Sequence, residues 1–452
     1  MGARDSHPLP YAGDHARVLP ELPGAALDWL TGMRADSMAR VADAGLPSTR
    51  SESWKYTNLR SLTKLSATPS TGAAAAAVAD LPVVEGAHRL VFVDGGYRPD
   101  LSDPGTLPEG ATLTNLAGAL SAMPERIEGR LGALAAANGH AVVNLNTAFM
   151  SDGLVLMLDK DVVVDEPIHL VFSGSGSGAR GASDTRGGVE QAANHMRNLI
   201  VAGPGSHVSV IESHLAAGGD AAYWTNPVTE IDVGEAAWLR HIKLQSDAAA
   251  ATHLAFTRAR VARDGGYENF ALSLGAGLSR NEIEVVLAGA GASCRLDGAF
   301  LMRGKQHCDT TTLIEHAAPG CTSNEVYKGV LDGRARGVFQ GKIVVAKDAQ
   351  QTNGHQQCKS ILLSDHAEID TKPELEIYAD DVKCSHGATA GELDENSLFY
   401  LRARGVPEDE ARSMLILAFL DELLEEITVL PVRTQLQALV EDWLATREGE
   451  AA

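Results

Sequence analysis

The sequence is poor in the cysteine spacings that build metal centres or disulfide frameworks. Its 452 residues include only five cysteines, and no two of them form a CxxC pair. A structural zinc site normally shows two paired ligand clusters, and a disulfide-rich domain needs a dense and even set of cysteines. Neither description fits this chain as a whole.

Basic residues are scarce relative to acidic ones. The chain has 38 Lys and Arg against 59 Asp and Glu, which gives a formal net charge of −21 at pH 7. An excess of Lys and Arg is what neutralises phosphate backbones and anionic membranes, so we expect no nucleic-acid or membrane partner. There is no run of about 18 apolar residues, and the N-terminus lacks a signal-peptide core. We therefore expect a cytoplasmic protein.

Common catalytic motifs are missing as well. The sequence contains no GxSxG elbow, no HExxH and no Walker A motif. Paired carboxylates such as Asp380 and Asp381 could serve a polysaccharide hydrolase or lyase. However, aromatic residues make up only 5% of the chain, which leaves few rings to stack on sugars. We expect a protein that is not an enzyme, with a β-helical carbohydrate-active enzyme as the alternative.

What the sequence does have is a long series of short β-type segments. From about Ala141, runs rich in Val, Ile and Leu such as "LVLML", "NLIVAG" and "NEIEVVLAG" are each bounded by Gly, Asp, Asn or Pro. Apparent corners at Pro204, Gly234, Gly265 and Gly291 recur at roughly 30-residue intervals, and later corners at about half that spacing. Fixed-period units of strand and turn predict a β-solenoid, whose coils bury their apolar faces by stacking. A β-sandwich, with strands about 8 to 12 residues apart, is the alternative.

Helical patterns flank this series. Residues 24–45 have apolar side chains at helical spacing and end at Gly45 and Pro47. Asp394 can cap a helix that ends near Gly405. The expected fold is mainly β: a parallel β-helix core at 86–390, with a helical N-terminal domain at 1–85 and a helical C-terminal domain at 391–452.

The C-terminal helix that opens at Pro407 is unusually apolar. A surface helix needs only a narrow apolar stripe, but Leu417, Phe419 and Leu420 spread the apolar surface almost all round. The excess predicts a second contact. It is made either with the last helix of the chain or with another chain.

Three places bring cysteine and histidine close together in the sequence: His307-Cys308, His355 with Cys358, and Cys384 with His386. Thiolate and imidazole suit iron, copper(I) and zinc. A lone cysteine in a strand is more often a core residue, and we interpret Cys294, Cys308 and Cys321 that way. Cys384 and His386 lie two apart, on one face of a predicted strand beside a Gly-rich turn, and are the main candidates. Cys358, about two half-coils earlier, is the next.

Three stretches resemble one family. "DTKPELEIYADDVKCSHGATAGELDENSLFYLRARGV" closely resembles the C-terminal signature of the SufB/SufD family of iron–sulfur cluster assembly proteins. "SESWKYTNLRSL" and "CTSNEVYKGVLDGRARGVFQGKIVV" are similar to its N-terminal and mid-core elements, so the likeness extends over essentially the whole chain. Gly387 after His386 resembles the SufD branch rather than the SufB branch. Cys358, in contrast, occupies the place where the SufB branch carries a cysteine tied to cluster building.

The resemblance implies a right-handed parallel β-helix with helical ends. It implies a non-catalytic scaffold subunit of the SUF machinery that supports de novo cluster assembly and iron acquisition, pairs with SufB, and docks the SufC ATPase through its C-terminal helices. A homodimer of the isolated chain, and a SufB-like subunit that assembles a cluster itself, stay open.

The resemblance also assigns roles to residues. His386 matches the histidine placed at the SufB–SufD interface near the nascent cluster, with Cys384 as its neighbour. These two are the expected iron or cluster ligands, shared with the partner chain, and Cys358 is a candidate sulfur-handling thiol. No tightly bound cofactor is implied, only a transient cluster or iron at the interface. The apolar helix implies a docking surface that includes Met414, Leu417, Phe419 and Leu420.

Overall fold

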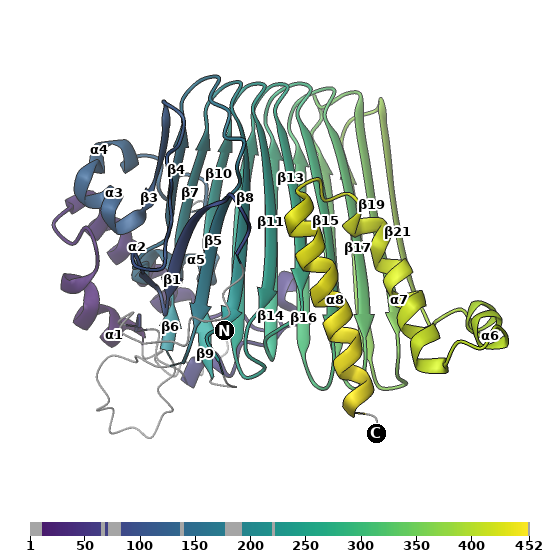
Figure 1. The fold of residues 1–452 in the computed structure, drawn as a ribbon. Coiled ribbons are helices and arrows are strands. Elements are labelled where there is room, and N and C mark those ends of the chain that lie inside the picture. Colours follow the sequence, from purple (N-terminus) through teal and green to yellow (C-terminus); the bar gives the residue numbers. More distant parts are fainter. Residues whose placement is uncertain are drawn as a thin grey trace, which may run out of the picture.

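The computed structural model describes residues 11–64, 68–70, 83–135, 140–176, 192–218 and 222–450, without the side chains of 447–450. Two long sheets form opposite walls of a solenoid in these residues (Figure 1). The first sheet has ten strands in the order β2 (Gly96–Tyr97), β1 (His88–Val93), β5 (Ile168–Gly174), β8 (His207–Ala216), β11 (Trp238–Ser246), β13 (Gly266–Ser273), β15 (Ser293–Met302), β17 (Thr322–Leu331), β19 (Thr352–Leu362) and β21 (Val382–Gly391).

The second sheet forms the opposite wall of the solenoid. Its main path is β20 (Glu368–Ile377), β18 (Arg336–Val345), β16 (His307–His316), β14 (Leu278–Leu287), β12 (Thr252–Val261), β10 (Val228–Val233), β7 (Arg197–Ala202), β4 (Leu154–Leu158) and β3 (Ala111–Asn115), with β6 (Ala192–Asn194) and β9 (Tyr223–Thr225) off that path. From β10 to β21 successive strands of the chain alternate between the two sheets. Neighbours within each sheet are parallel except at β1–β2 and β3–β4.

The predicted parallel β-helix core is confirmed. Cys294 is in register with Ser323, Ser323 with Gly354, and Gly354 with Cys384, offsets of 29, 31 and 30 residues. This is the coil length that the turn spacing predicts. The interior is a continuous apolar core that includes Leu239, Leu296, Ile314 and Phe339. Each coil therefore buries its inner face against its neighbours, which is what holds a solenoid together.

One part of the predicted strand series is wrong. The stretch Ala141–Phe149 is a helix, α5, and residues 142–149 are all buried. The helices α3 (Leu116–Ala122) and α4 (Pro124–Ile127) precede it within the range predicted for the β-helix. A helix that is buried on every side lacks the one-sided apolar pattern that would distinguish it from strands, and here even Asn144, Asn146 and Thr147 are buried.

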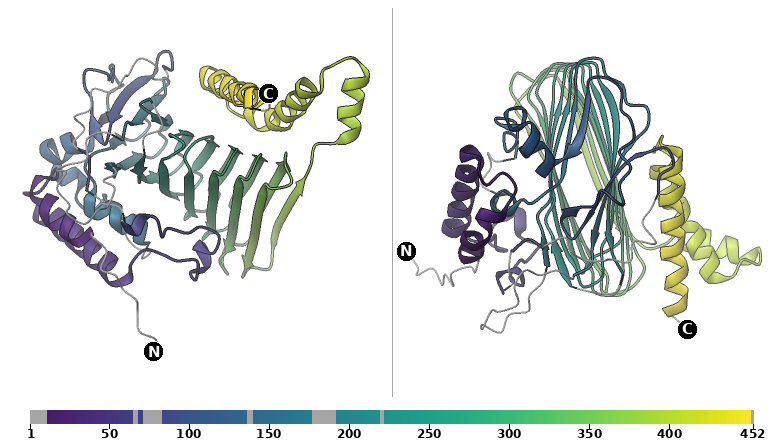
Figure 2. Two further views of the ribbon diagram at one scale, coloured as in Figure 1. Left: turned by 90° about the horizontal axis from the view of Figure 1, so that it is seen from below. Right: turned by 60° about the vertical axis from the view of Figure 1, so that its left-hand side comes forward.

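The N-terminal helices cover the outer face of the second sheet. They are α1 (Tyr11–Val18), the 3₁₀ turn η1 (Leu19–Glu21) and α2 (Asp28–Ala44), which ends at Gly45 with φ +72° as predicted. Tyr11 and Val41 pack with Phe149 of α5 and with Trp224 and Leu254 of the sheet. Figure 2 shows these helices on one side of the solenoid and the C-terminal helices on the other.

The C-terminal helices are α6 (Glu395–Ala403), α7 (Glu408–Leu424) and α8 (Leu430–Glu450). The Asp394 side chain accepts hydrogen bonds from the backbone N–H groups of Asn396 and Ser397, so the predicted cap is confirmed. Helices α7 and α8 pack on the outer face of the ten-stranded sheet through Leu420, Leu424, Leu436 and Val440. In the described residues no helix has both the length and the apolar composition that a membrane span requires.

Candidate functional site

The solenoid ends at β20 and β21, which are the last strands of their two sheets. Among the described residues no strand pairs with the far edge of either one. We call this part of the molecule the open end; it lies next to α6 and α7 in Figure 1. An unpaired edge exposes a row of backbone N–H and C=O groups that another chain can bind.

Cys384 and His386 both lie on β21 at the open end. Cys384 is in register with Gly354 and His386 with Gln356, so the two side chains belong to neighbouring rows on one face of the strand. Cys384 is half-buried against the apolar core, whereas His386 is exposed. Burial raises the pKa of the Cys384 thiol, while a backbone hydrogen bond at Gly354 opposes the rise.

Gly354 leaves space beneath the thiol. A Cβ atom at this position would lie 3.6 Å from Cys384 Sγ and 3.4 Å from Ser323 Oγ, within ordinary contact distance. The half-buried thiol therefore lies beside Gly354, close to the side chains of Ser323 and Ile343.

Cys358 is placed differently. It lies on β19, one coil further in, with no exposed surface, and its register neighbours are Tyr327 and Ala388. Burial raises the pKa of this thiol to about 12, although a hydrogen bond with Ser360 favours the thiolate. Because the thiolate is the nucleophile and the metal ligand, Cys358 is unreactive in this conformation.

A buried carboxyl group lies behind His386. Glu325, Gln356 and His386 occupy one register row across β17, β19 and β21. Gln356 Nε2 donates a hydrogen bond to Glu325 Oε2 over 2.7 Å, and Gln356 Oε1 has no hydrogen-bond partner within the described ranges. Burial raises the pKa of Glu325 to about 7, against the opposing effect of its hydrogen bonds. The imidazole is thus backed by a polar row that leads to an ionisable group.

Sequence reasoning missed Glu325 and Gln356. The inward or outward direction of a polar residue in a solenoid strand depends on its register with coils about 30 residues away. A local signal was present: Glu325 lies two residues from Ser323 and two from Tyr327 in β17, so all three side chains are on the buried face. A period-2 analysis anchored on the buried tyrosine would have found it.

A thiol and an imidazole at an open strand edge form an incomplete ligand set. Both are suited to iron and to iron–sulfur clusters, but a stable cluster normally requires about four protein ligands. Within the described residues, the groups of three or more histidine, cysteine or carboxylate side chains close enough to hold a metal do not include Cys384 or His386. Cys384 and His386 by themselves provide only two of these ligands.

Comparison with known proteins supplies the context for this site. The SufBD protein N-terminal region matches residues 21–170, and the SUF system FeS cluster assembly SufBD core domain matches residues 170–419. An iron–sulfur cluster assembly SufBD family protein of Synechocystis sp. is 32% identical over 91% of this chain and 90% of its own length. The iron–sulfur cluster assembly protein SufD of Escherichia coli is 31% identical over 86% of this chain and 87% of its own length.

The chain belongs to the SufBD family of iron–sulfur cluster assembly proteins.

Membership of the SufBD family confirms the resemblance seen in the sequence. It gives no support to the carbohydrate-active alternative. Asp380 and Asp381 are exposed and lie in the corner between β20 and β21, a position where aspartates commonly form turns. Cys294 and Cys308 are buried, and Cys321 donates a hydrogen bond from its thiol to Gly289 O, so all three are packed within the solenoid as expected.

The N-terminal SufBD motif has a clear structural role. Residues 51–64, which include η2 (Glu52–Trp54) and η3 (Leu62–Lys64), cross the outer face of the second sheet, and we call them the strap. The Trp54 ring lies 4.1 Å from the guanidinium carbon of Arg280 on β14, and Thr57 bonds to His307 on β16. Lys372 on β20 donates to Glu52. The strap thus joins the N-terminal helices to the last coil.

The predicted docking residues differ in exposure. Met414 is 45% exposed, whereas Leu417 and Phe419 are partly buried and Leu420 is fully buried against the ten-stranded sheet. Lys328 on β17 holds α7 in place by donating to Phe419 O and to Glu422. The apolar surface of α7 is therefore divided between contact within the chain and contact with solvent. The docking role of these residues stays a prediction.

A second set of buried polar side chains lies within the solenoid, on strands that precede those of the open end by more than 100 residues. Glu212 contacts His214, His241 and Asn198, and Asp247 contacts His253 and Tyr223. Burial lowers the pKa of the nearby Lys243 to about 8 and that of His253 to about 3. These contacts join side chains of different coils, so no local pattern in the sequence predicts them.

Proposed function

We propose that this SufBD protein is a non-catalytic scaffold subunit of the SUF machinery, acting in the cytoplasm to support assembly of iron–sulfur clusters and the iron acquisition that it requires. One observation carries the proposal. Cys384 and His386 share a face of the last strand at an end of the solenoid where the described chain offers no pairing partner. A ligand pair at an open edge is suited to being completed by another chain.

The partner at this edge is proposed to be SufB, the paralogue with the same core fold. Two solenoids can join end to end when their terminal strands pair, because the exposed backbone groups of each edge satisfy the other. Ile377 and Tyr378, at the end of β20, are 40% and 62% exposed and would contribute apolar contact there. The same edge allows two copies of this chain to pair when SufB is absent.

The cluster is cargo at this interface rather than a resident cofactor. Few and exchangeable ligands allow a cluster to leave, whereas a closed set of four thiolates would retain it. His386 and Cys384 are proposed to supply part of the ligand set, and SufB the rest. Motion of the two subunits would then open or close the site.

The ATPase SufC is proposed to dock on the C-terminal helices. Phe399 and Tyr400 on α6 are 74% and 57% exposed, and Met414 on α7 is 45% exposed. Helix α6 projects away from the solenoid (Figure 1). Exposed aromatic side chains on a projecting helix are typical of an interaction surface. ATP-driven movement at α6 and α7 would reach β21 directly, since β21 is the strand that leads into α6.

The direct test is cluster content. The protein is coexpressed with SufB and SufC from its own host, and iron and sulfide are measured in the purified complex for wild type and His386→Ala. The control is His366→Ala, another exposed histidine at a coil corner. We expect His386→Ala to lose most of the iron and sulfide and the control to retain them. Equal content in both variants would remove the proposed role of His386.

A further inference from the structure

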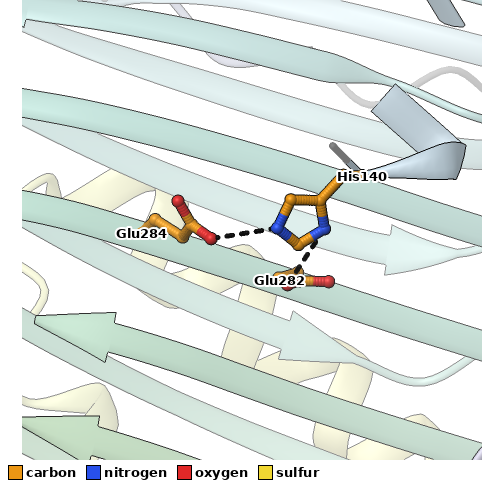
Figure 3. A group of neighbouring side chains, drawn as sticks. All are labelled: His140, Glu282 and Glu284. Atoms are coloured by element: carbon orange, nitrogen blue, oxygen red, sulfur yellow. Dashed lines mark ion pairs between the residues drawn. The ribbon is translucent and has the colours of Figure 1, made fainter. Parts of the chain in front are cut away.

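A second cluster of possible metal ligands lies away from the open end. His140, the residue before α5, meets Glu282 and Glu284 of β14 on the outer face of the second sheet (Figure 3). His140 Nδ1 lies 3.6 Å from Glu282 Oε1, and His140 Nε2 lies 3.3 Å from Glu284 Oε1. The two glutamate side chains are about nine-tenths buried, and the histidine side chain is 19% exposed.

Each of the two carboxylates is bonded through one of its oxygens to an arginine. Arg280 Nη2 donates to Glu282 Oε2 over 3.1 Å, and Arg258 Nη1 donates to Glu284 Oε2. Each glutamate therefore has one oxygen held by a guanidinium and the other directed to the imidazole. Hydrogen bonds that hold the second oxygen of a carboxylate are a common support for metal ligands.

When His140 is neutral, the charges around the cluster leave a negative excess. Glu282, Glu284 and Asp309 are the carboxylates, and Arg258 and Arg280 are the cations, with Arg280 also bonded to Asp309. Three negative groups thus face two positive ones in a partly desolvated place. Buried carboxylates close to one another need a compensating cation.

Side chains of neighbouring strands and of the strap surround the cluster. The Phe256 ring on β12 lies 5.2 Å from the imidazole ring, and Thr311 and Leu313 on β16 are the register neighbours of Glu282 and Glu284. The strap reaches the same place, because Trp54 stacks on Arg280. The cluster itself therefore joins two parts of the chain, and three others, β12, β16 and the strap, pack around it.

We propose that His140, Glu282 and Glu284 bind a first-row divalent cation such as Zn²⁺, Fe²⁺ or Mn²⁺. One imidazole nitrogen and two carboxylate oxygens lie within 4.8 Å of one another. Ligands on one tetrahedral ion are roughly 3.3 Å apart, given metal–ligand bonds of about 2.0–2.2 Å. The spacing of His140 Nε2 and Glu284 Oε1 already matches, and Glu282 reaches the same ion by rotation of its side chain.

Three protein ligands leave a fourth position on the ion. The partial exposure of His140 directs this position to solvent, so water or a small anion completes the coordination. Nitrogen with carboxylate oxygen suits borderline divalent ions better than Cu(I), which prefers sulfur. The site has no ligand in common with Cys384 and His386 and does not depend on the proposed function.

The test uses the full chain stripped of metal by a chelator and titrated with Zn²⁺. The chain carries Cys384→Ser and His386→Ala, so that binding at the open end does not contribute. We expect one equivalent to bind, and Glu282→Gln and Glu284→Gln each to weaken this binding by at least about tenfold. His366→Ala is the matched control and should bind as the parent does. Unchanged affinity in both glutamine variants would overturn the proposal.

A crystal of the wild-type chain soaked in Zn²⁺ gives an independent measurement, which does not depend on how the variants fold. Anomalous scattering is expected to place an ion between His140, Glu282 and Glu284. A site in which the imidazole keeps contact with both carboxylates, with anomalous peaks only elsewhere, would show that protonated His140 bridges the two glutamates and that no metal site exists there.

Discussion

Glu325 is a buried ionisable residue next to the candidate site. It is a carboxylic acid with no exposed surface inside the apolar solenoid, and burial raises its pKa to about 7. In the unfolded chain the same group titrates near 4.5. Between these pH values the folded state holds more protons than the unfolded state, so the contribution of Glu325 to stability decreases as pH rises.

The substitution Glu325→Gln tests whether the Glu325 carboxyl group lowers the stability of the folded chain as pH rises. The amide can still accept the hydrogen bond from Gln356 and carries no charge at any pH. We expect the variant to gain stability relative to wild type between pH 5 and pH 8, by up to ~3 kcal/mol at the upper end. Denaturant unfolding of both proteins at the two pH values measures the difference. If the stability difference between the variant and wild type is the same at pH 5 and at pH 8, the pKa of Glu325 is not raised in the folded chain.

The buried thiol of Cys358 gives a second prediction. Its thiol is fully buried and its pKa is raised to about 12. A thiol that is neither ionised nor accessible cannot take up sulfur or iron in this conformation. We expect Cys358→Ser to retain the iron and sulfide content of the wild-type complex with SufB and SufC. Loss of both, in a variant whose secondary structure is unchanged, would favour a SufB-like subunit that builds a cluster itself.

The elements that the sequence predicted well are those with local signals. The end of α2 at Gly45 requires a positive φ that glycine adopts easily, and Asp394 caps α6 through its own side chain. The coils repeat because turn residues recur at their corners. Helix α5 was missed because its apolar residues face packed neighbours on all sides. Which side of α7 packs, with Leu420 inward and Met414 outward, depends on the position of the distant Phe270 and Val330.

The candidate site was predicted only in part. The two-residue spacing of Cys384 and His386 places them on one face of a strand whatever the rest of the fold does. Their position on the last coil follows from the helical pattern that begins at Asp394. By contrast, the row from His386 to Glu325 joins three coils, and the His140 cluster joins a helix start to a strand more than 140 residues later. Contacts of that kind are set by register across the whole solenoid, and no local pattern reports them.

The next prediction concerns the contact of Trp54 that holds the strap against the second sheet. Trp54 is 5% exposed and stacks on Arg280, so Trp54→Ala removes both apolar burial and a cation–π contact. Truncation of a buried tryptophan costs about 3–5 kcal/mol where the surroundings cannot collapse. We expect faster amide hydrogen exchange across residues 51–64 in the variant, with β21 unaffected.

The exposed Arg60 of the same strap provides the control, because Arg60→Ala removes no buried contact. Exchange in Trp54→Ala that stays at the wild-type rate would mean that the strap is held by Thr57 and Glu52 without the tryptophan.

At the scale of the whole molecule, the solenoid has two different outer faces and two different ends. One face is covered by the N-terminal helices and the strap, and the other by α7 and α8 (Figure 2). At the first end the sheets finish with the antiparallel pairs β1–β2 and β3–β4, whereas at the open end they finish with strands that pair in parallel with the preceding coil. We place the proposed contact with SufB at the open end because Cys384 and His386 lie there.

Docking of SufC is tested on α6. We expect Phe399→Asp to reduce copurification of SufC strongly, because a charge at the centre of an apolar contact is costly to bury. The change leaves the fold intact, since this side chain is 74% exposed. Leu430→Asp is the control, at a large apolar residue that is 63% exposed on α8. Equal loss of SufC in both variants would spread the docking surface over the C-terminal helices. Full retention of SufC by Phe399→Asp would place the docking surface elsewhere.

The central claim is that a SufB paralogue covers the open end of this solenoid. A photo-cross-linking amino acid placed at Lys383, exposed on β21 next to Cys384, tests it most directly in the complex with SufB and SufC. The comparison is the same amino acid at Lys160, which is exposed in the corner after β4 near the other end. The account predicts cross-links to SufB from position 383 and none from position 160. Cross-links to SufB from position 160 alone would contradict it.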